Sequence, residues 1–290
     1  MKFVCSLAFS DPTDCVELAR TADECGWDAI VVSDHVVHPE RIDTPYPYTP
    51  DGKPRWEAPT PWPDPWVVIG AMAAVTQRLR FITGIYVLPM RNPFAAAKAI
   101  GTAAVISGDR VTLGIGAGWM SEEFERMEQP FERRGARMDE MVEVMRKLWT
   151  GEMAEHHGRF YDFDRLQMSP AVNETIPIYT GGLSKPALRR VGRLADGWFS
   201  DLHTTDELRE IIGTLREMRT EYGREDVPLD VVASCRDAFD LDGYKRLEEI
   251  GVTHLQTMPW VFYGSAGDSL EQKRDGLRRF ADDVIAKMEG

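Results

Sequence analysis

Short β-rich segments alternate with helical segments along the whole 290-residue chain, and this order restricts the possible folds more than any other feature. Strands are predicted at residues 3–7, 29–32, 79–88, 111–115, 176–180, 197–199, 229–233 and 254–259. Helices are predicted at residues 14–25, 65–75, 93–107, 134–149, 185–195, 206–222, 243–250 and 270–288. Because helical crossovers join parallel strands, the alternation predicts an α/β protein with a parallel sheet.

The number of units favours a closed barrel over an open sheet. Eight strand–helix units in fewer than 300 residues fit a (β/α)8 TIM barrel. The main rival is a Rossmann sheet, which usually carries GxGxxG after its first strand, whereas Ser10-Asp11-Pro12 follows the first strand here. The sequence shows no linker, internal repeat or low-complexity tract. We therefore expect a single (β/α)8-barrel domain over residues 1–290.

Two long insertions interrupt the alternation, one after the second strand at 36–65 and one at 150–175. The first contains nine prolines and several aromatic residues. Loops of this length are uncommon in compact domains unless they have a function. The aromatic residues of the first insertion either form a lid over a flat ligand or pack the loop onto the barrel. The candidate lid residues are Tyr46, Tyr48, Trp56, Trp62 and Trp66.

Composition argues against several classes of partner. The formal net charge of −13 disfavours nucleic acid and anionic membranes as partners. It says little about a small-molecule substrate, because a local basic pocket can lie in an acidic surface. The N-terminal segment turns polar too early for a signal peptide, and no apolar run reaches the roughly 20 residues that span a bilayer. The four cysteines include no CxxC pair and are expected to be buried thiols. These features predict a cytoplasmic protein.

Active sites of (β/α)8 barrels lie at the C-terminal ends of the strands, and this rule selects the candidate residues. The segments at these ends are Ser33-Asp34-His35, Gly84 to Leu88, Gly116 to Trp119, Gly181-Gly182-Leu183-Ser184, Ser200-Asp201 and Met258-Pro259-Trp260. The long first insertion leaves from the same face and can cover it. No GxSxG or HExxH motif occurs, and no cluster has the spacing of a metal site, so we predict no metal.

Two of these segments carry recognisable chemistry. A free imidazole titrates near pH 6.5, so His35 could pass a proton to or from a bound ring, or it could be a hydrogen-bonded rim residue. Gly181, Gly182 and Ser184 lie between a strand and a helix. A glycine turn at a helix N-terminus can bind phosphate, and it can equally be an ordinary turn in which Ser184 caps the helix.

Several motifs together resemble the luciferase-like monooxygenase superfamily, and in particular its branch described as F420-dependent oxidoreductases. They occur in the family's order from about residue 1 to 200. The motifs are Val32-Ser33-Asp34-His35, residues 83–93, residues 107–119 with Glu122-Glu123-Phe124, Arg133-Arg134-Gly135, Leu148-Trp149-Thr150-Gly151, residues 157–161, Gly181-Gly182 and Ala195-Asp196-Gly197-Trp198.

The resemblance implies a cofactor across the barrel mouth, either coenzyme F420 or, alternatively, FMN. It implies that His35 is the catalytic proton partner. The residues implied to bind the cofactor are Asp34, Gly84, Ile85 and Val87 at the ring, Ala117 and Gly118 at the ribityl chain, and Gly181, Gly182 and Ser184 at the phosphate. A backbone bulge at Gly84-Ile85, often with a cis peptide, is also implied.

The family likeness further implies a homodimer that transfers hydride with a small substrate, or, with FMN, an oxygen-using enzyme that needs a flavin reductase. The aromatic composition of the candidate lid suggests that the substrate is partly apolar. The chain departs from some deazaflavin dehydrogenases at two points. Trp119 stands where they have a glutamate, and no arginine is obvious at the phosphate turn, although Lys185, Arg189 and Arg190 follow it.

Overall fold

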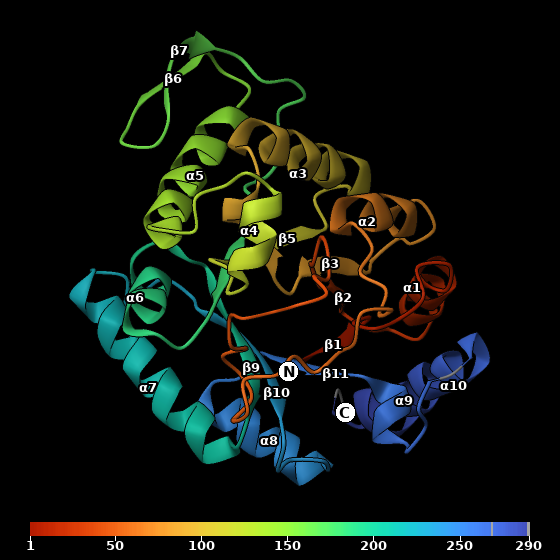
Figure 1. The fold of residues 1–290 in the computed structure, drawn as a ribbon. Helices are drawn as coiled ribbons and strands as arrows, with labels where there is room; N and C mark the ends of the chain where they lie inside the picture. Colours follow the sequence, from red (N-terminus) through yellow and green to blue (C-terminus); the bar gives the residue numbers. More distant parts are fainter. Residues whose placement is uncertain (268, 289–290) are drawn as a thin grey trace.

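A computed structural model describes residues 1–267 and 269–288, which form a closed parallel barrel surrounded by helices (Figure 1). The eight barrel positions are taken by β1 (Lys2–Ser6), β2 (Ala29–Val32), β3 (Arg80–Thr83) with β4 (Tyr86–Val87), β5 (Val111–Gly116), β8 (Ile178–Gly181), β9 (Gly197–His203), β10 (Asp230–Cys235) and β11 (His254–Thr257). Neighbouring strands follow the order β3-β2-β1-β11-β10-β9-β8-β5, and a β3–β5 pairing closes the ring. The predicted α/β TIM barrel is confirmed.

The sequence predicted one continuous strand over 79–88, and this prediction is wrong. The third barrel strand divides into β3 and β4 at Gly84-Ile85, which are joined by a cis peptide bond. Both parts pair with β5: Ile82 lies opposite Thr112, and Tyr86 lies opposite Ile115. Four steps on one strand therefore match three on the other, which is the extra residue of a β-bulge. The strand predicted at 197–199 is also longer, because β9 continues to His203.

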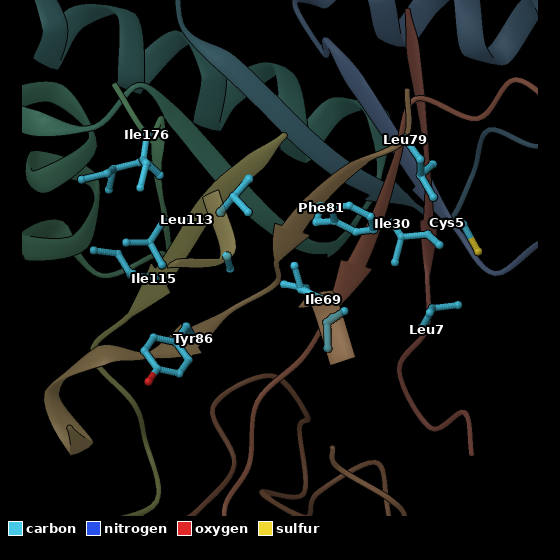
Figure 2. Packing of buried hydrophobic residues seen from close by; sticks show 14 of the residues in the cluster. Cys5, Leu7, Ile30, Ile69, Leu79, Phe81, Tyr86, Leu113, Ile115 and Ile176 are labelled. Carbon is cyan, nitrogen blue, oxygen red and sulfur yellow. The ribbon is translucent and has the colours of Figure 1, made fainter. Parts of the chain in front are cut away.

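The barrel has two hydrophobic layers, because successive side chains of a strand point to opposite faces. In β1, Phe3 and Cys5 face the surrounding helices and Val4 faces the barrel interior. Figure 2 shows the outer layer, in which Ile30 and Phe81 from two strands pack beside Ile69 of a helix. The residues filling the interior are Val4, Ala29, Val31, Ile82, Ile85, Tyr179, Phe199 and Val232. The barrel is therefore a packed core, and a ligand can occupy only its mouth.

Several crossover helices begin at a capping residue that the sequence supplies locally. Asp64 accepts hydrogen bonds from the amides of Trp66 and Val67, which begins α2, and Asn92 does the same for α3. The long helices are α1 (Cys15–Glu24), α2 (Pro65–Ala73), α3 (Pro93–Ser107), α5 (Arg134–Trp149), α6 (Lys185–Leu194), α7 (Thr205–Glu221), α8 (Leu241–Ile250) and α10 (Leu270–Phe280). Short helical segments are η1 (Leu88–Met90), α4 (Ser121–Arg126), α9 (Pro259–Phe262), η2 (Ala281–Ile285) and α11 (Ala286–Met288). Among the described residues, no helix is long and apolar enough to cross a membrane.

The two insertions have different structures. Residues 36–64, which we call the lid, contain no helix or strand. Residues 150–175, which we call the hairpin insertion, contain the antiparallel strands β6 (Ala154–His157) and β7 (Asp162–Leu166). In Figure 1 the hairpin insertion lies on the outside of the barrel next to α5. The lid crosses the region enclosed by the strands.

Candidate active site

A cavity of about 1440 Å³ opens at the C-terminal ends of the barrel strands. All six strand-end segments selected from the sequence contribute to its lining, although four of their residues do not line it: Tyr86, Leu88, Pro259 and Trp260. The catalytic and cofactor-binding candidates therefore come together from different crossovers. They are Asp34, His35, Gly84, Ile85, Val87, Ala117, Gly118, Gly181, Gly182 and Ser184. Among the described residues, no group of three or more His, Cys, Asp or Glu side chains is arranged to hold a metal ion.

The imidazole of His35 is held by a buried carboxylate. Its Nδ1 lies 2.9 Å from Oε2 of Glu123, a residue of α4 that is only 2% exposed. The other Glu123 oxygen accepts the backbone N–H groups of Val36 at 2.7 Å and Val37 at 3.3 Å. One carboxylate thus holds both the imidazole at the end of β2 and the first residues of the lid.

The charge on Glu123 determines how His35 can handle a proton. Burial alone would raise the pKa of this carboxyl, but the hydrogen bond and charge of His35 and the two backbone amides outweigh it and lower the pKa. An ionised carboxylate only accepts hydrogen bonds. A neutral His35 therefore carries its proton on Nδ1, and Nε2 is left free to accept or return a second proton.

Asp34 occupies the centre of a second buried network. Its two oxygens accept hydrogen bonds from the Arg91 guanidinium, each at 2.7 Å, and one also accepts the N–H of Val87 at 2.8 Å. Burial raises the pKa of the Asp34 carboxyl despite the guanidinium beside it. Arg91 itself stacks on Tyr86, 4.4 Å from the ring centre. Asp34 lines the cavity, but its oxygens bond to Val87 of β4 and to Arg91, which follows η1.

The glycines after β5 bring the backbone very close to its neighbours. A Cβ atom on Gly116 would lie 1.9 Å from the side chain of Ile85, and one on Gly118 would lie 2.5 Å from Val87. Gly118 also has φ +80°, a conformation that L side chains rarely adopt. A larger residue here would force Ile85 or Val87 to move, and both of these line the cavity. The two glycines therefore maintain the shape of this wall of the cavity.

One side of the cavity carries three arginines, of which the sequence had indicated only Arg190 as a neighbour of the phosphate turn. Arg133 and Arg134 at the start of α5, and Arg190 of α6, line the cavity together with the turn Gly181–Ser184. Arg134 donates to the carbonyl oxygens of Gly118 at 2.9 Å and Phe131 at 3.3 Å, and Arg190 pairs with Asp139. The Arg133-Arg134-Gly135 motif belongs to a different crossover from the phosphate turn, and only folding places the two together.

The turn Gly181–Ser184 has both features that the sequence left as alternatives. The Ser184 hydroxyl accepts the N–H of Ala187 at 3.4 Å and caps α6. The same turn lines the cavity, and Gly182 has φ +104°. A helix N-terminus with nearby arginines attracts anions, so this side fits a phosphate group. We call the set Gly116 to Gly118, Arg133, Arg134 and Gly181 to Ser184 the glycine side of the cavity.

Aromatic residues of the lid cover the imidazole. His35 lies 4.6 Å from Trp56 and 5.0 Å from Trp62, measured between ring centres, and Tyr46 contacts Trp56 and Trp119 in edge-to-face geometry. Tyr46, Tyr48, Trp56 and Trp62 all line the cavity. Trp66 does not, because it belongs to α2 and packs against Tyr86. Four of the five candidate lid residues thus lie over the mouth, and Trp66 is part of the core.

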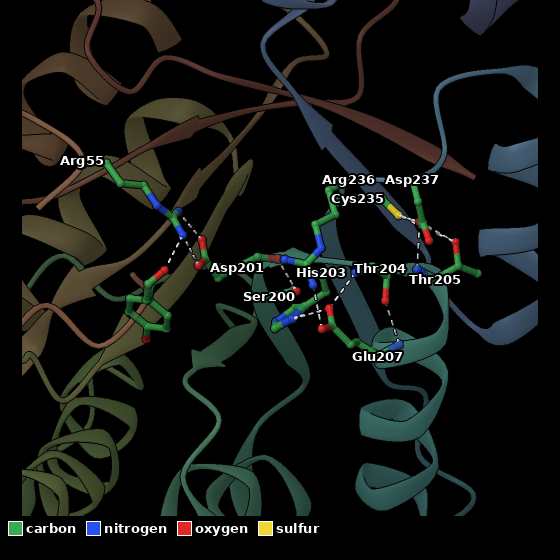
Figure 3. Close-up of polar contacts among 11 residues, drawn as sticks. Arg55, Ser200, Asp201, His203, Thr204, Thr205, Glu207, Cys235, Arg236 and Asp237 are labelled. Carbon is green, nitrogen blue, oxygen red and sulfur yellow. Dashed lines mark hydrogen bonds and ion pairs between the residues drawn. The ribbon is translucent and has the colours of Figure 1, made fainter. Parts of the chain in front are cut away.

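An ion pair fastens the lid to the far side of the mouth. Arg55 donates two hydrogen bonds to Asp201 of β9, each at 2.8 Å, as Figure 3 shows. On the other side Glu122 accepts the amides of Asp43 and Thr44. These contacts join residues that are 79 and 146 positions apart, so no local sequence pattern could have indicated them.

Comparison with known proteins identifies the family. The model of the luciferase-like monooxygenase family matches residues 5–276. An uncharacterised protein of Mycobacterium tuberculosis is 39% identical over 290 residues, covering 99% of this chain and 100% of the relative. The F420-dependent glucose-6-phosphate dehydrogenase of Nakamurella multipartita is 28% identical over 243 residues, covering 82% of this chain and 67% of that protein.

Solved structures share the fold at low sequence identity. The F420-dependent tetrahydromethanopterin reductase of Methanopyrus kandleri superposes with a TM-score of 0.74 and 16% identity, covering 99% of both chains. The oxygenating constituent of the 3,6-diketocamphane monooxygenase of Pseudomonas putida, in complex with FMN, gives 0.59 and 21% identity over 82% of this chain and 66% of that one. The family match and the barrel agree with the resemblance found in the motifs, and we conclude that this chain is an enzyme of the luciferase-like monooxygenase family.

Proposed function

We propose that this enzyme is an F420-dependent oxidoreductase that transfers hydride to or from a small, partly apolar organic substrate. The observation that carries the proposal is the convergence of a glycine turn, two arginines and a carboxylate-held imidazole on one cavity beneath an aromatic lid. Relatives named as F420-dependent dehydrogenases support the choice of cofactor. The cavity volume of about 1440 Å³ exceeds the roughly 300–1,000 Å³ of common ligand pockets, so there is room for a cofactor and a substrate together.

The residues present fit such a cofactor. Gly181, Gly182 and Ser184, with the start of α6, would hold its phosphate, and Ala117 and Gly118 would lie along its ribityl chain. Gly84, Ile85 and Val87 would hold its ring, and Asp34 would support them through its bond to the Val87 amide. When bound, the deazaflavin supplies a carbon that can accept or donate hydride. The lid would exclude water from that carbon.

His35 is the residue to which we assign the proton. With Glu123 accepting from Nδ1, the Nε2 atom can take a proton from a substrate hydroxyl or return one to a carbonyl oxygen. Glu123 keeps the ring in one orientation and does not itself contact the substrate in this proposal. We further propose that the enzyme works in the cytoplasm as a homodimer, which sedimentation of the purified protein would test.

The alternative cofactor is FMN, in a two-component monooxygenase that receives reduced flavin from a partner reductase and uses oxygen. The FMN-bound structural neighbour has the same barrel, which favours keeping this alternative. A spectral titration of the purified protein with F420 and with FMN separates the two. We expect saturation by F420 and binding of FMN weaker by about tenfold or more, a difference of roughly 1.4 kcal/mol. Tighter binding of FMN, with product formation that requires oxygen, would replace the first proposal by the second.

A further inference from the structure

The cavity has two chemically different sides, and the barrel order places them opposite each other. The glycine side comes from the loops that follow β5 and β8. In the ring of eight strands, β11 lies across from β5, and β1 lies across from β8. The loops after β1, β10 and β11 form the opposite side of the mouth. We call this side the apolar arm; its main residues are Phe9, Ala238, Phe239, Met258, Val261 and Phe262.

The apolar arm contains no formal charge. None of the described residues that β1, β10, β11 and their following loops contribute to the cavity lining is Asp, Glu, Lys, Arg or His. Two of its polar residues bond to each other: the Gln256 side-chain amide donates to the Ser234 hydroxyl at 3.2 Å, and that hydroxyl donates to the backbone carbonyl oxygen of Gln256 at 3.3 Å. The buried Gln256 Oε1 has no hydrogen-bond partner and is an acceptor, which does not favour an anion. Arg55 and Asp201, at the edge of the arm, neutralise each other. An anion in the arm would therefore lose water without gaining a cation.

Large apolar side chains in the arm are exposed in the absence of a ligand. Phe239 is 59% exposed, Val261 55% and Phe9 44%. Apolar surface gathered in a concave site is typical of ligand binding, whereas single exposed apolar residues elsewhere need no explanation. Covering these three side chains with an apolar molecule would remove their surface from water.

The arm is connected to the imidazole through the lid. Phe9 packs edge-to-face on Trp62 at 5.4 Å, and Trp62 in turn lies 5.0 Å from His35. A ligand in the arm would thus lie against the same tryptophan that covers the proton-carrying residue. Its reactive end would be near His35, and its body would extend toward Phe239 and Val261.

We propose that the apolar arm binds the substrate, and that the substrate is an uncharged molecule with an extended apolar body. This inference rests on the proposed function for its reaction, but the arm itself is defined by its lining. The two sides of the cavity then bind different molecules: the arginines of the glycine side hold the anionic cofactor, and the apolar arm excludes anions. The residues that select the substrate are Phe239 and Val261.

Intrinsic tryptophan fluorescence and calorimetry test the proposal, with and without bound cofactor. The probes are 2-hexanone, 2-octanone and 2-decanone, with octanoate as a charged molecule of matched length. We expect the Kd of the ketones to fall by about threefold to fourfold per added methylene, which corresponds to roughly 0.8 kcal/mol. Octanoate is expected to bind at least about tenfold more weakly than 2-octanone, because its carboxylate finds no cation in the arm.

Two variants and one control locate the site. Phe239→Ser and Val261→Ser should each raise the Kd of 2-decanone several-fold. Ile106→Ser on the outer helix α3 changes an apolar residue of matching exposure, 60%, that does not line the cavity, and should leave the Kd unchanged. Equal binding of octanoate and 2-octanone, no dependence on chain length, or no ketone binding would overturn the proposal. Ketone binding without F420 binding would instead preserve the arm and refute the cofactor assignment.

Discussion

The two insertions of this barrel are similar in length but differ in what they cover. The lid lies over the cavity and is attached to residues at the mouth at three points, Val36 to Glu123, Asp43 to Glu122 and Arg55 to Asp201. No residue of the hairpin insertion lines the cavity. The hairpin insertion packs on the outer helices, where Phe163 contacts Phe94 of α3. An insertion after a strand end can serve the site, whereas one that follows a crossover helix stabilises the outside of the barrel.

In each insertion several backbone amides donate to one glutamate, which makes the comparison testable. Glu123 accepts two amides of the lid and the Nδ1 atom of His35. Glu140 of α5 accepts the amides of Arg159, Phe160 and Tyr161 in the hairpin insertion, at 2.8 to 3.1 Å. The two carboxylates use the same type of bond. Each also contacts an imidazole, but His35 lines the cavity, whereas His156, whose Nε2 lies 3.3 Å from Glu140, does not. Their removal should therefore have different consequences.

The largest effect is expected from Glu123→Ala. The variant loses the acceptor that orients His35, so turnover should fall by about 100-fold or more, the lower range for a lost general acid–base contribution. Steady-state kinetics with the cofactor that binds would measure it. Because both residues act through one imidazole, the double variant Glu123→Ala with His35→Gln should be no slower than His35→Gln alone. If instead the loss of turnover in the double variant equals the product of the two single losses, Glu123 acts independently of His35.

Glu140→Ala should lower stability and leave turnover unchanged, in contrast to Glu123→Ala. It leaves three backbone amides of the hairpin insertion without their charged acceptor, and hydrogen bonds to charged groups are each worth about 1.5–3 kcal/mol. We expect the free energy of unfolding to fall by about 1.5–3 kcal/mol in total, not per bond, because water can replace part of the bonding at this partly exposed site. Denaturant unfolding measures the loss. Cofactor affinity and turnover below the transition should stay at wild-type values, and a large loss of affinity would show that the hairpin insertion serves the site.

The Arg55–Asp201 pair should contribute moderately to binding and little to stability. Its side chains are 38% and 26% exposed, and ion pairs of this kind contribute about 0–1 kcal/mol. Arg55→Met should therefore raise KM by about fivefold at most, while the denaturation midpoint changes little. Arg20→Met, which removes an ion pair of similar exposure to Glu17 on α1 and does not line the cavity, provides the matched control. A KM equal to that of the control would show that the ion pair does not hold the lid closed.

The smallest effects are expected with pH, and they have opposite directions in the two insertions. The pKa of Glu123 is lowered from its ordinary 4.5, so its stabilisation of the lid is present above that pH and is lost as the pH falls through the folded-state pKa. The pKa of His157 is raised from 6.5, chiefly by its hydrogen bond to Asp162, so this stabilisation is present below 6.5 and is lost as the pH rises. Hydrogen exchange of each segment between pH 4 and 9, corrected for intrinsic rates, tests both directions.

The barrel and its mouth could be predicted because their signals are local. Period-2 and helical patterns, together with glycines after strands, are each contained in about ten residues. The bulge at Gly84-Ile85 was implied only by the family resemblance. Local patterns could not predict it, because the division of residues 79–88 into β3 and β4 depends on their pairing with β5. The hairpin inside 150–175 was missed for a related reason, since its strands are short and mostly polar.

The electrostatic partners could not be predicted, because they join distant parts of the chain. His35 and Glu123 are 88 residues apart, and Asp34 and Arg91 are 57 apart. Glu123 was part of a recognised motif, but nothing in the motif indicated that it faces β2. Arg134 likewise belonged to a motif without an assigned role. Such pairs depend on which crossovers lie next to each other in the closed barrel.

Hydrogen–deuterium exchange of the protein with and without saturating cofactor tests the central claim most directly. If the mouth is the site and the lid covers it, the cofactor should slow exchange in residues 36–64, 116–120 and 181–187. Residues 153–166 of the hairpin insertion should exchange at the same rate in both states. Protection confined to the hairpin insertion, or a lid whose exchange the cofactor does not change, would contradict the account.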